Sequence, residues 1–192
     1  RQDLRYEALK ELNVICDISK NECVKRGQYE GYREEVENPD SMTETFVSIN
    51  LQSNDPIWKG VPITLTAGKA LDKKCTEIRI KYKKESEREA NELVFRLQPD
   101  AGIEFGIWTK VPGYEMKLKE EKLHFLFKDI YPELPEAYEQ VLFNAMSGEH
   151  DLFTSSKEVL ETWRILDSIQ KTWEVSQGQM LTYPKGSKIS EI

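Results

Sequence analysis

The chain has 192 residues, 39% of them hydrophobic and 32% charged, values that are typical of a folded globular protein and exclude a disordered one. Its 27 Lys and Arg against 34 Asp and Glu give a net charge of −7, which argues against a nucleic acid as partner. No stretch has the apolar length of a membrane span or of a signal peptide, so we expect no membrane contact.

Three cysteines, Cys16, Cys23 and Cys75, stand at spacings that match no metal motif. We therefore expect no metal site, and reduced thiols in a cytoplasmic protein. The chain begins with Arg1 rather than Met, inside a predicted helix, which favours a piece of a longer protein.

The N-terminal segment is predicted to be a helix, because Leu4, Ala8 and Leu12 recur at helical spacing between residues 3 and 14. The polar, glycine-containing stretch 25–41 comes next, and its composition predicts a long surface loop.

The middle of the chain alternates apolar and polar residues, which is the pattern of half-buried strands. In the segment 76–83, for example, Ile78, Ile80 and Tyr82 share one face. The charged connection 83–92 is predicted as a loop or a short helix. Strands are predicted in the segments TFVSINLQ, VPITLTAG, TEIRIKYK, NELVFRLQP, GIEFGIW and KLHFLFK.

Two helices are predicted after the strands, followed by an irregular tail from Val175 onward. The first lies within residues 134–150, with Pro135 in its first turn. The second opens at Ser155, which has the spacing of a capping box with Glu158. Their expected apolar faces consist of Tyr138, Val141, Leu142, Ala145 and Met146 in the first, and Leu160, Trp163, Leu166, Ile169 and Trp173 in the second.

A block of strands between helical ends predicts an α+β domain that covers residues 1–192, with no Rossmann domain. We expect a large, mostly antiparallel sheet with helices packed on one face. Its other face needs a cover, either from helices or from another chain.

The sequence contains no catalytic constellation. The ten glycines are scattered, and none forms a G-x-G-x-x-G turn between a strand and a helix. His124 lies in a predicted strand and His150 follows a predicted helix, and neither has neighbours that would complete a triad or a ligand set. We interpret both as structural or solvated, and expect no catalytic residue in this chain.

Three lysines, Lys69, Lys73 and Lys74, gather at the end of the strand VPITLTAG in an otherwise acidic protein. We expect Gly68 to let the backbone turn tightly there. Lys69 and Lys74 could then converge on one phosphate, since ammonium groups donate to its oxygens. The alternative is an ordinary solvated loop.

Arg96 and Gln98 lie two residues apart on a predicted strand, so they project to the same face about 7 Å apart. A guanidinium and an amide placed together would suit a sugar phosphate. The alternative is a cross-strand salt bridge of Arg96 with Glu77 or a similar partner.

Several motifs together resemble one known family. GQYEGY, DSMTETFVSINLQSNDPIWKGVPITLTAGKALDKKCTEIRIKYK, NELVFRLQPDAGI, LPEAYEQVLFNAMSGEHDLFTSSKEVLETWRILDSI and YPKGS occur in this order and cover nearly the whole chain. The chain is similar throughout to the C-terminal domain of glucose-6-phosphate dehydrogenase.

This resemblance implies a parent enzyme that oxidises D-glucose 6-phosphate to 6-phospho-D-glucono-1,5-lactone with NADP as hydride acceptor, the first step of the oxidative pentose phosphate pathway. It implies that the sheet serves for homodimerisation. It also assigns Lys69, Lys74 and Gln98 to the substrate.

Two motifs of the family are absent from this sequence, the R-I-D-H-Y-L-G-K segment with the general base and the GASGDLA cofactor turn. The resemblance therefore implies that NADP is held mainly by a separate N-terminal domain, and that this chain alone is inactive. Animal members carry a second, structural NADP. Arg79 and Arg96 match two positions of that site, whereas Lys188 stands for an arginine, Thr66 and Cys75 replace basic residues, and ISEI replaces the usual G-P. The alternative to a dehydrogenase domain is a stand-alone, non-catalytic interaction or regulatory module that retains the fold.

Overall fold

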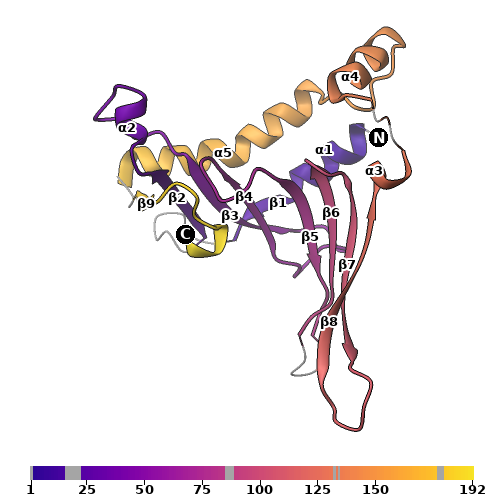
Figure 1. The fold of residues 1–192 in the computed structure, drawn as a ribbon. Helices are drawn as coiled ribbons and strands as arrows, with labels where there is room; N and C mark the ends of the chain where they lie inside the picture. The colour runs from indigo at the N-terminus through magenta and orange to yellow at the C-terminus, as the bar shows by residue number, and fades with distance from the viewer. Residues whose placement is uncertain (1, 16–22, 85–88, 132, 134, 177–179) are drawn as a thin grey trace. The chain divides into compact units, whose positions relative to one another are not determined.

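The structure is a computed structural model, and it describes residues 2–15, 23–84, 89–131, 133, 135–176 and 180–192. The chain divides into two compact units (Figure 1), the first made of Arg1–Asp72 and Val141–Ile192 and the second of Lys73–Gln140. Each unit has its own mostly antiparallel sheet, of five and of four strands, so the predicted α+β class is confirmed. The strands that we expected in one large sheet are shared between these two.

The sheet of the first unit is built around β3 (Phe46–Ser53). Antiparallel β4 (Ile63–Gly68) lies along one edge of β3, and β2 (Val24–Tyr29) and then β1 (Leu12–Val14) lie along the other. The short β9 (Leu181–Tyr183) joins β2 in parallel, which places the C-terminal segment beside residues 27–29.

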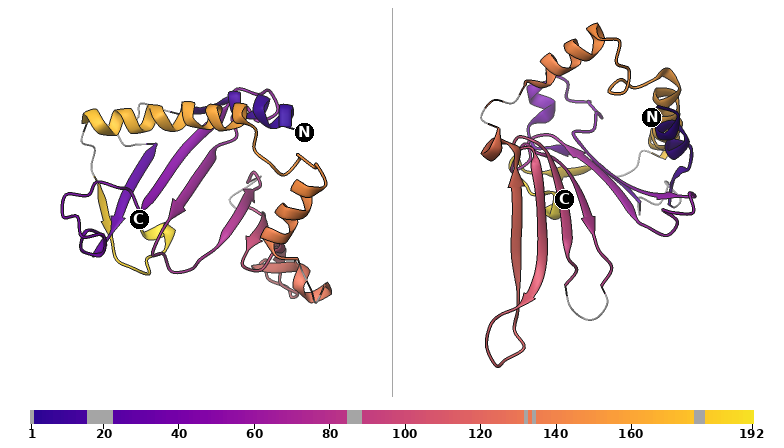
Figure 2. Two further views of the ribbon diagram at one scale, coloured as in Figure 1. Left: turned by 90° about the horizontal axis from the view of Figure 1, so that it is seen from above. Right: turned by 90° about the vertical axis from the view of Figure 1, so that its right-hand side faces the viewer.

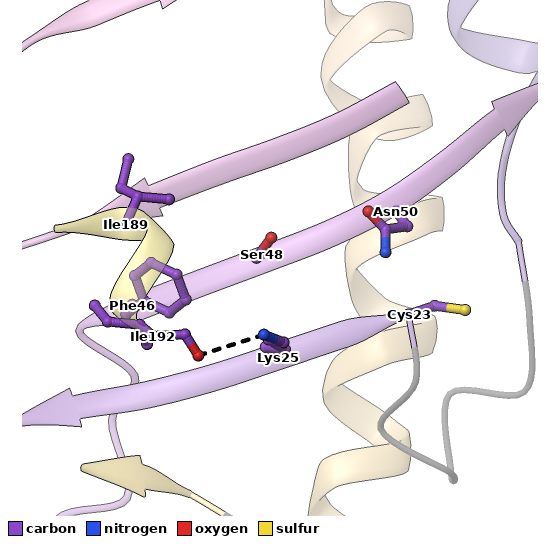
Figure 3. Close-up of a pocket in the computed structure, with 7 residues that line it drawn as sticks. All are labelled: Cys23, Lys25, Phe46, Ser48, Asn50, Ile189 and Ile192. Carbon is purple, nitrogen blue, oxygen red and sulfur yellow. Dashed lines mark hydrogen bonds between the residues drawn. The ribbon is translucent and has the colours of Figure 1, made fainter. Parts of the chain in front are cut away.

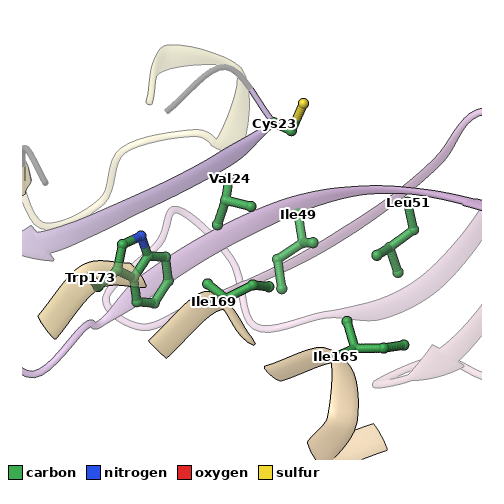
Figure 4. Packing of buried hydrophobic residues seen from close by; sticks show 7 residues of the cluster. All are labelled: Cys23, Val24, Ile49, Leu51, Ile165, Ile169 and Trp173. Atoms are coloured by element: carbon green, nitrogen blue, oxygen red, sulfur yellow. The ribbon is translucent and has the colours of Figure 1, made fainter. Parts of the chain in front are cut away.

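Helix α5 (Ser156–Ser176) covers one face of this sheet (Figure 2). Its side chains Ile165, Ile169 and Trp173 point at β2 and β3 (Figure 4). The buried cluster that they form together consists of Cys23, Val24, Ile49, Leu51, Ile165, Ile169 and Trp173. Shorter helices of the same unit are α1 (Gln2–Lys10), α2 (Tyr32–Glu35) and η2 (Ile189–Glu191).

The apolar stripe predicted for α5 is only partly confirmed. Ile169 and Trp173 are buried, but Leu160 is 70% and Trp163 47% exposed, and Ile165 takes part in the core instead. The first half of the helix therefore presents apolar side chains to the outside. Helix α4 (Ala137–Met146) behaves in the same way, because Tyr138 is 82% and Met146 88% exposed.

Three local predictions in the first unit are wrong. The N-terminal helix ends at Lys10, because residues 12–14 pair with β3 as β1. The expected loop 25–41 contains strand β2, and the expected irregular tail contains β9. In all three places a tertiary partner supplies the hydrogen bonds and the burial that the local composition does not indicate.

The second unit is an antiparallel meander of β5 (Thr76–Lys81), β6 (Glu92–Gln98), β7 (Gly102–Lys110) and β8 (Leu118–Leu126). Helix α3 (Phe127–Ile130) follows β8 directly. Part of the charged connection 83–92 lies outside the described residues.

The register of the meander places apolar side chains in two rows on one face. The rows are Ile78, Phe95, Ile103 and Phe125, and Ile80, Leu93, Phe105 and Leu123. The opposite face carries charged side chains, among them Glu77, Arg79, Glu92, Arg96, Glu104 and Lys122.

None of the helices that the structure describes is long and apolar enough to cross a membrane. Across the described residues, no three His, Cys, Asp or Glu side chains are grouped so that they could hold a metal ion. Cys75 is a free thiol, but Cys23 is disulfide-bonded, so the expectation of reduced thiols is wrong for Cys23.

The predicted capping box at the start of α5 is confirmed. Glu158 Oε2 accepts from the Ser155 N–H at 2.7 Å, and the Glu158 N–H donates to Ser155 Oγ at 3.3 Å. Arg5 of α1 donates to the other carboxylate oxygen of Glu158 at 2.5 Å and to the carbonyl of Phe153 at 2.8 Å. The Arg5 hydrogen bond first, and those from Ser155 next, lower the pKa of Glu158 to about 2. The carboxylate of Glu158 thus joins α1 to α5.

We predict that Glu158→Gln destabilises the fold in a pH-dependent way. The wild-type carboxylate has a lower pKa folded than unfolded, so its contribution is complete above the unfolded pKa of about 4.3. It disappears as the pH falls toward about 2. Urea unfolding at several pH values should therefore show a difference from wild type at pH 7 that shrinks below about pH 5. Glu174→Gln, on an exposed position of the same helix, is the matched control. An undiminished difference at pH 3 would contradict the assignment.

Candidate functional site

Lys69, the first predicted site residue, directly follows β4 and is exposed. Its N–H donates to the carbonyl of Thr45 at 2.8 Å, which prolongs the pairing of β4 with β3 by one residue. Among the described residues, no hydrogen bond or ion pair engages its ammonium group. A fixed backbone therefore carries a free positive charge at this turn.

Gly68 has a different role from the predicted one. Its φ is not positive, so it does not make the turn. A Cβ at this position would lie 2.9 Å from Leu71 Cδ1 and 2.9 Å from Phe46 Cδ2. Glycine is therefore needed for close packing, and the left-handed residue of the turn is Ala70, with φ 52°.

The C-terminal segment 183–187 is hydrogen-bonded to the turn that contains Lys69. The Tyr183 hydroxyl lies 2.9 Å from the carbonyl oxygen of Lys69. The Gly186 N–H donates to the carbonyl of Ala70 at 2.7 Å, and the Asp72 N–H donates to the carbonyl of Ser187 at 3.0 Å. The sequence pointed to this segment only through the motif YPKGS, and its contact with the lysine turn was not predicted.

The other predicted substrate residues, Lys74 and Gln98, belong to the second unit. Lys74 lies before β5 and Gln98 ends β6, opposite Thr76 in the register. Both side chains are exposed, and within the described part of the chain neither has a hydrogen-bonding partner. They are available to a ligand, and their role in binding one stays a prediction.

Arg96 and Arg79 on the polar face of the second sheet are already paired. Arg96 Nη2 lies 2.5 Å from Oε2 of Glu104, and Lys122 donates to Oε1 of the same carboxylate at 3.0 Å. Burial alone would raise the pKa of Glu104, but the hydrogen bond from Lys122 and the charges of Lys122 and Arg96 lower it. The salt bridge of Arg96 is therefore cross-strand, as in the alternative reading, but its partner is Glu104 rather than Glu77.

Arg79 lies between two carboxylates, 2.6 Å from Glu77 and 2.8 Å from Glu92. The hydrogen bond from Arg79 is the main cause that lowers the pKa of Glu77. A phosphate that approached Arg79 or Arg96 would compete with these carboxylates for the guanidinium charge. The arrangement thus favours a structural ion-pair network over a dinucleotide site at these two residues.

Lys188, which stands for an arginine of the structural NADP site, lies in the first unit before η2. Its N–H donates to Glu191 at 2.9 Å, and its side chain is exposed. A shallow cavity of about 190 Å³ lies beside η2 (Figure 3). Its lining residues are Cys23, Lys25, Phe46, Ser48, Asn50, Ile189 and Ile192. Lys25 Nζ donates to the carbonyl of Ile192 at 3.3 Å, so its single ammonium group is already engaged by the protein.

Neither histidine takes part in a catalytic arrangement among the described residues. His124 stands on β8 opposite Glu104 in the register, on the polar face of its sheet. The His150 carbonyl accepts from the side-chain amide of Gln2 at 3.0 Å. The interpretation of both as structural or solvated stays a prediction.

Comparison with known proteins links these residues to one family. Residues 1–191 match the family model described as glucose-6-phosphate dehydrogenase, C-terminal domain. Glucose-6-phosphate 1-dehydrogenase of Chlamydia trachomatis is 33% identical over 210 residues, which cover 97% of this chain and 48% of the relative. The cytoplasmic glucose-6-phosphate 1-dehydrogenase 5 of Arabidopsis thaliana is 34% identical and is covered over 38% of its length.

Solved structures agree with the sequence comparison. A glucose-6-phosphate dehydrogenase in complex with its substrate glucose-6-phosphate superposes with a TM-score of 0.81 at 28% identity, over 97% of this chain and 41% of that one. Glucose-6-phosphate 1-dehydrogenase from Mycobacterium avium gives a TM-score of 0.76 at 29% identity, over 97% of this chain and 40% of its own. The chain spans less than half the length of the curated relatives described above. It belongs to the family of glucose-6-phosphate dehydrogenase C-terminal domains.

Proposed function

We propose that this chain is the substrate-binding and dimerisation part of a glucose-6-phosphate dehydrogenase. The intact enzyme would oxidise D-glucose 6-phosphate to 6-phospho-D-glucono-1,5-lactone and pass the hydride to NADP. Family membership over residues 1–191 supports the enzyme class. The similarity to a dehydrogenase solved in complex with glucose-6-phosphate supports the choice of ligand.

The free ammonium group of Lys69 is the observation that carries this proposal. Carboxylates or a carbonyl already bind five other basic residues described above. These are Arg5, Arg79, Arg96, Lys122 and Lys25. Lys69 keeps its charge available on a fixed backbone, which is what a dianionic phosphate requires. We propose that Lys74 and Gln98 complete the contacts with the sugar phosphate.

We propose that NADP and the general base are supplied by a further part of the enzyme. The exposed apolar side chains of α4 and of the first half of α5 support this, because such a surface is usually covered. They include Tyr138, Leu142, Phe143, Met146, Leu160 and Trp163. A cytoplasmic location is part of the proposal; the Arabidopsis relatives include cytoplasmic and chloroplastic enzymes.

We propose that the apolar face of the second sheet is the homodimer interface. Its side chains are unusually exposed for their type, with Ile78 53%, Leu123 60% and Phe125 42% accessible. A continuous apolar sheet face of this kind needs a partner, and a second copy offers the same rows of side chains.

We predict that the purified chain does not reduce NADP in the presence of glucose 6-phosphate. Its sequence contains neither the histidine motif nor the glycine-rich turn of the family, so both the base and the nicotinamide site are missing. The measurement is the absorbance of NADPH at saturating substrate. Sustained turnover proportional to the chain concentration would contradict the proposal and would point to catalytic groups within the chain.

We predict that Lys69→Ala raises the KM for glucose 6-phosphate in the intact dehydrogenase. A charge-assisted hydrogen bond to phosphate contributes about 1.5–3 kcal/mol, which corresponds to roughly a 10- to 100-fold effect. The KM for NADP should stay unchanged. Lys59→Ala, which removes an exposed lysine elsewhere in the first unit, is the control. Unchanged kinetics for Lys69→Ala would remove this residue from the substrate site.

We predict that Leu123→Lys prevents dimerisation, because it places a charge within the apolar rows of the second sheet. His124→Lys adds the same charge on the opposite, polar face next to Glu104, and should leave the dimer intact. Light scattering should give the mass of two chains for wild type and His124→Lys, and of one for Leu123→Lys. Dimers of Leu123→Lys, or a monomeric wild type, would show that this face is not the interface.

A further inference from the structure

We propose that Tyr183 is a positioning residue for substrate, because its hydroxyl fixes the backbone from which Lys69 reaches the phosphate. This inference rests on the proposed function, in which Lys69 binds glucose 6-phosphate. It assigns a specific task to the C-terminal segment 183–187, which contacts the lysine turn across more than a hundred residues of sequence.

The Tyr183 hydroxyl has three oxygen neighbours. It lies 2.9 Å from the carbonyl of Lys69 and 3.0 Å from the carbonyl of Thr45. The Thr45 hydroxyl is 2.9 Å away. A phenol has a single hydrogen, which the two carbonyls share. The Thr45 hydroxyl, which is also 3.4 Å from the carbonyl of Gly27, is the third neighbour. The residue is 2% exposed, so water does not compete for these bonds.

Packing holds the ring of Tyr183 in place. The rings of Phe46 and Tyr29 meet it edge to face, at centroid distances of 5.9 Å and 6.4 Å. Phe46 is itself 2% exposed and begins β3, the central strand of the sheet. The position of the phenol oxygen is therefore fixed by packing in the core, and not by the loop that it contacts.

The conformation of the turn that carries Lys69 depends on the hydrogen bond to the Tyr183 hydroxyl. Lys69 is bonded at both ends, through its N–H to Thr45 and through its carbonyl to Tyr183. The next residue, Ala70, has a left-handed backbone that non-glycine residues rarely adopt, and the Gly186 N–H bonds its carbonyl. Residues 69–72 therefore keep an unusual conformation because the segment 183–187 satisfies their polar groups.

A fixed backbone matters for a lysine because its side chain is long and flexible. The ammonium group loses rotational freedom whenever it binds a phosphate. If the backbone also had to be ordered, the entropy lost on binding would be larger and the affinity lower. The Tyr183 hydroxyl removes this second loss, whereas the ring alone would fill the same space without bonding the turn.

The test is Tyr183→Phe in the intact dehydrogenase, with Tyr29→Phe as matched control. Tyr29 packs in the same cluster, but its side chain is hydrogen-bonded to Glu35 and Lys185 lies over its ring, so its hydroxyl does not bond the turn. We expect Tyr183→Phe to raise the KM for glucose 6-phosphate about fivefold, with kcat and the KM for NADP within about twofold, since an interaction common to ground and transition state is lost. Tyr29→Phe should change none of the three constants by more than about twofold.

A double-mutant cycle with Lys69→Ala shows whether Tyr183 acts through Lys69. If it does, Tyr183→Phe has no further effect on the KM in the Lys69→Ala background. An equal effect in both backgrounds, or no effect of Tyr183→Phe where Lys69→Ala has a large one, would overturn the positioning role alone. No effect of Lys69→Ala itself would overturn the proposed function instead.

Folding of each variant is checked by its thermal unfolding transition. If Tyr183→Phe does not fold, Thr45→Val provides a second test, because it removes the hydroxyl that lies 2.9 Å from the Tyr183 oxygen and helps to hold it, together with the acceptor of the Tyr29 N–H. A rise in the KM for glucose 6-phosphate alone would support the inference. Equal rises in the KM for both substrates would indicate a merely structural role and overturn it.

Discussion

The hydrogen bonds of the Tyr183 hydroxyl are the constraint on which the candidate site depends. They connect the end of β9 to the start of β3 and to the residue that follows β4. Around them, Tyr29, Phe46 and Tyr183 form a buried aromatic cluster against which Leu71 packs. The shape of the lysine turn is therefore determined by residues that are distant in sequence, and not by the turn itself.

The two kinds of positive charge in the protein differ in their surroundings. Arg79 and Arg96 each have carboxylate partners on the second sheet, so opposite charges are paired on its polar face. Lys69 has no such partner among the described residues. A phosphate would compete with carboxylates for the arginines but could approach the lysine without such competition. This contrast supports a substrate role for the turn and a structural role for the arginine network.

Much of the fold could be predicted from the sequence. Period-two alternation predicted β3 to β8, and the spacing of Ser155 and Glu158 predicted the start of α5. Strand β2 was missed because it contains Arg26, whose burial depends on Glu44 at 3.0 Å and on the ring of Trp173 at 5.0 Å. Lys69 was found through composition and resemblance. The role of Tyr183 could not be found, because its partners lie 114 and 138 residues away.

Amide hydrogen exchange, followed by NMR in the purified chain, tests the central claim most directly. If the segment 183–187 fixes the lysine turn, the N–H groups of Lys69, Asp72 and Gly186 exchange as slowly as those of the paired strands β2 and β3, because each is hydrogen-bonded. Exchange of these three amides at the rate of an unbonded surface loop, while the strands stay protected, would contradict the account.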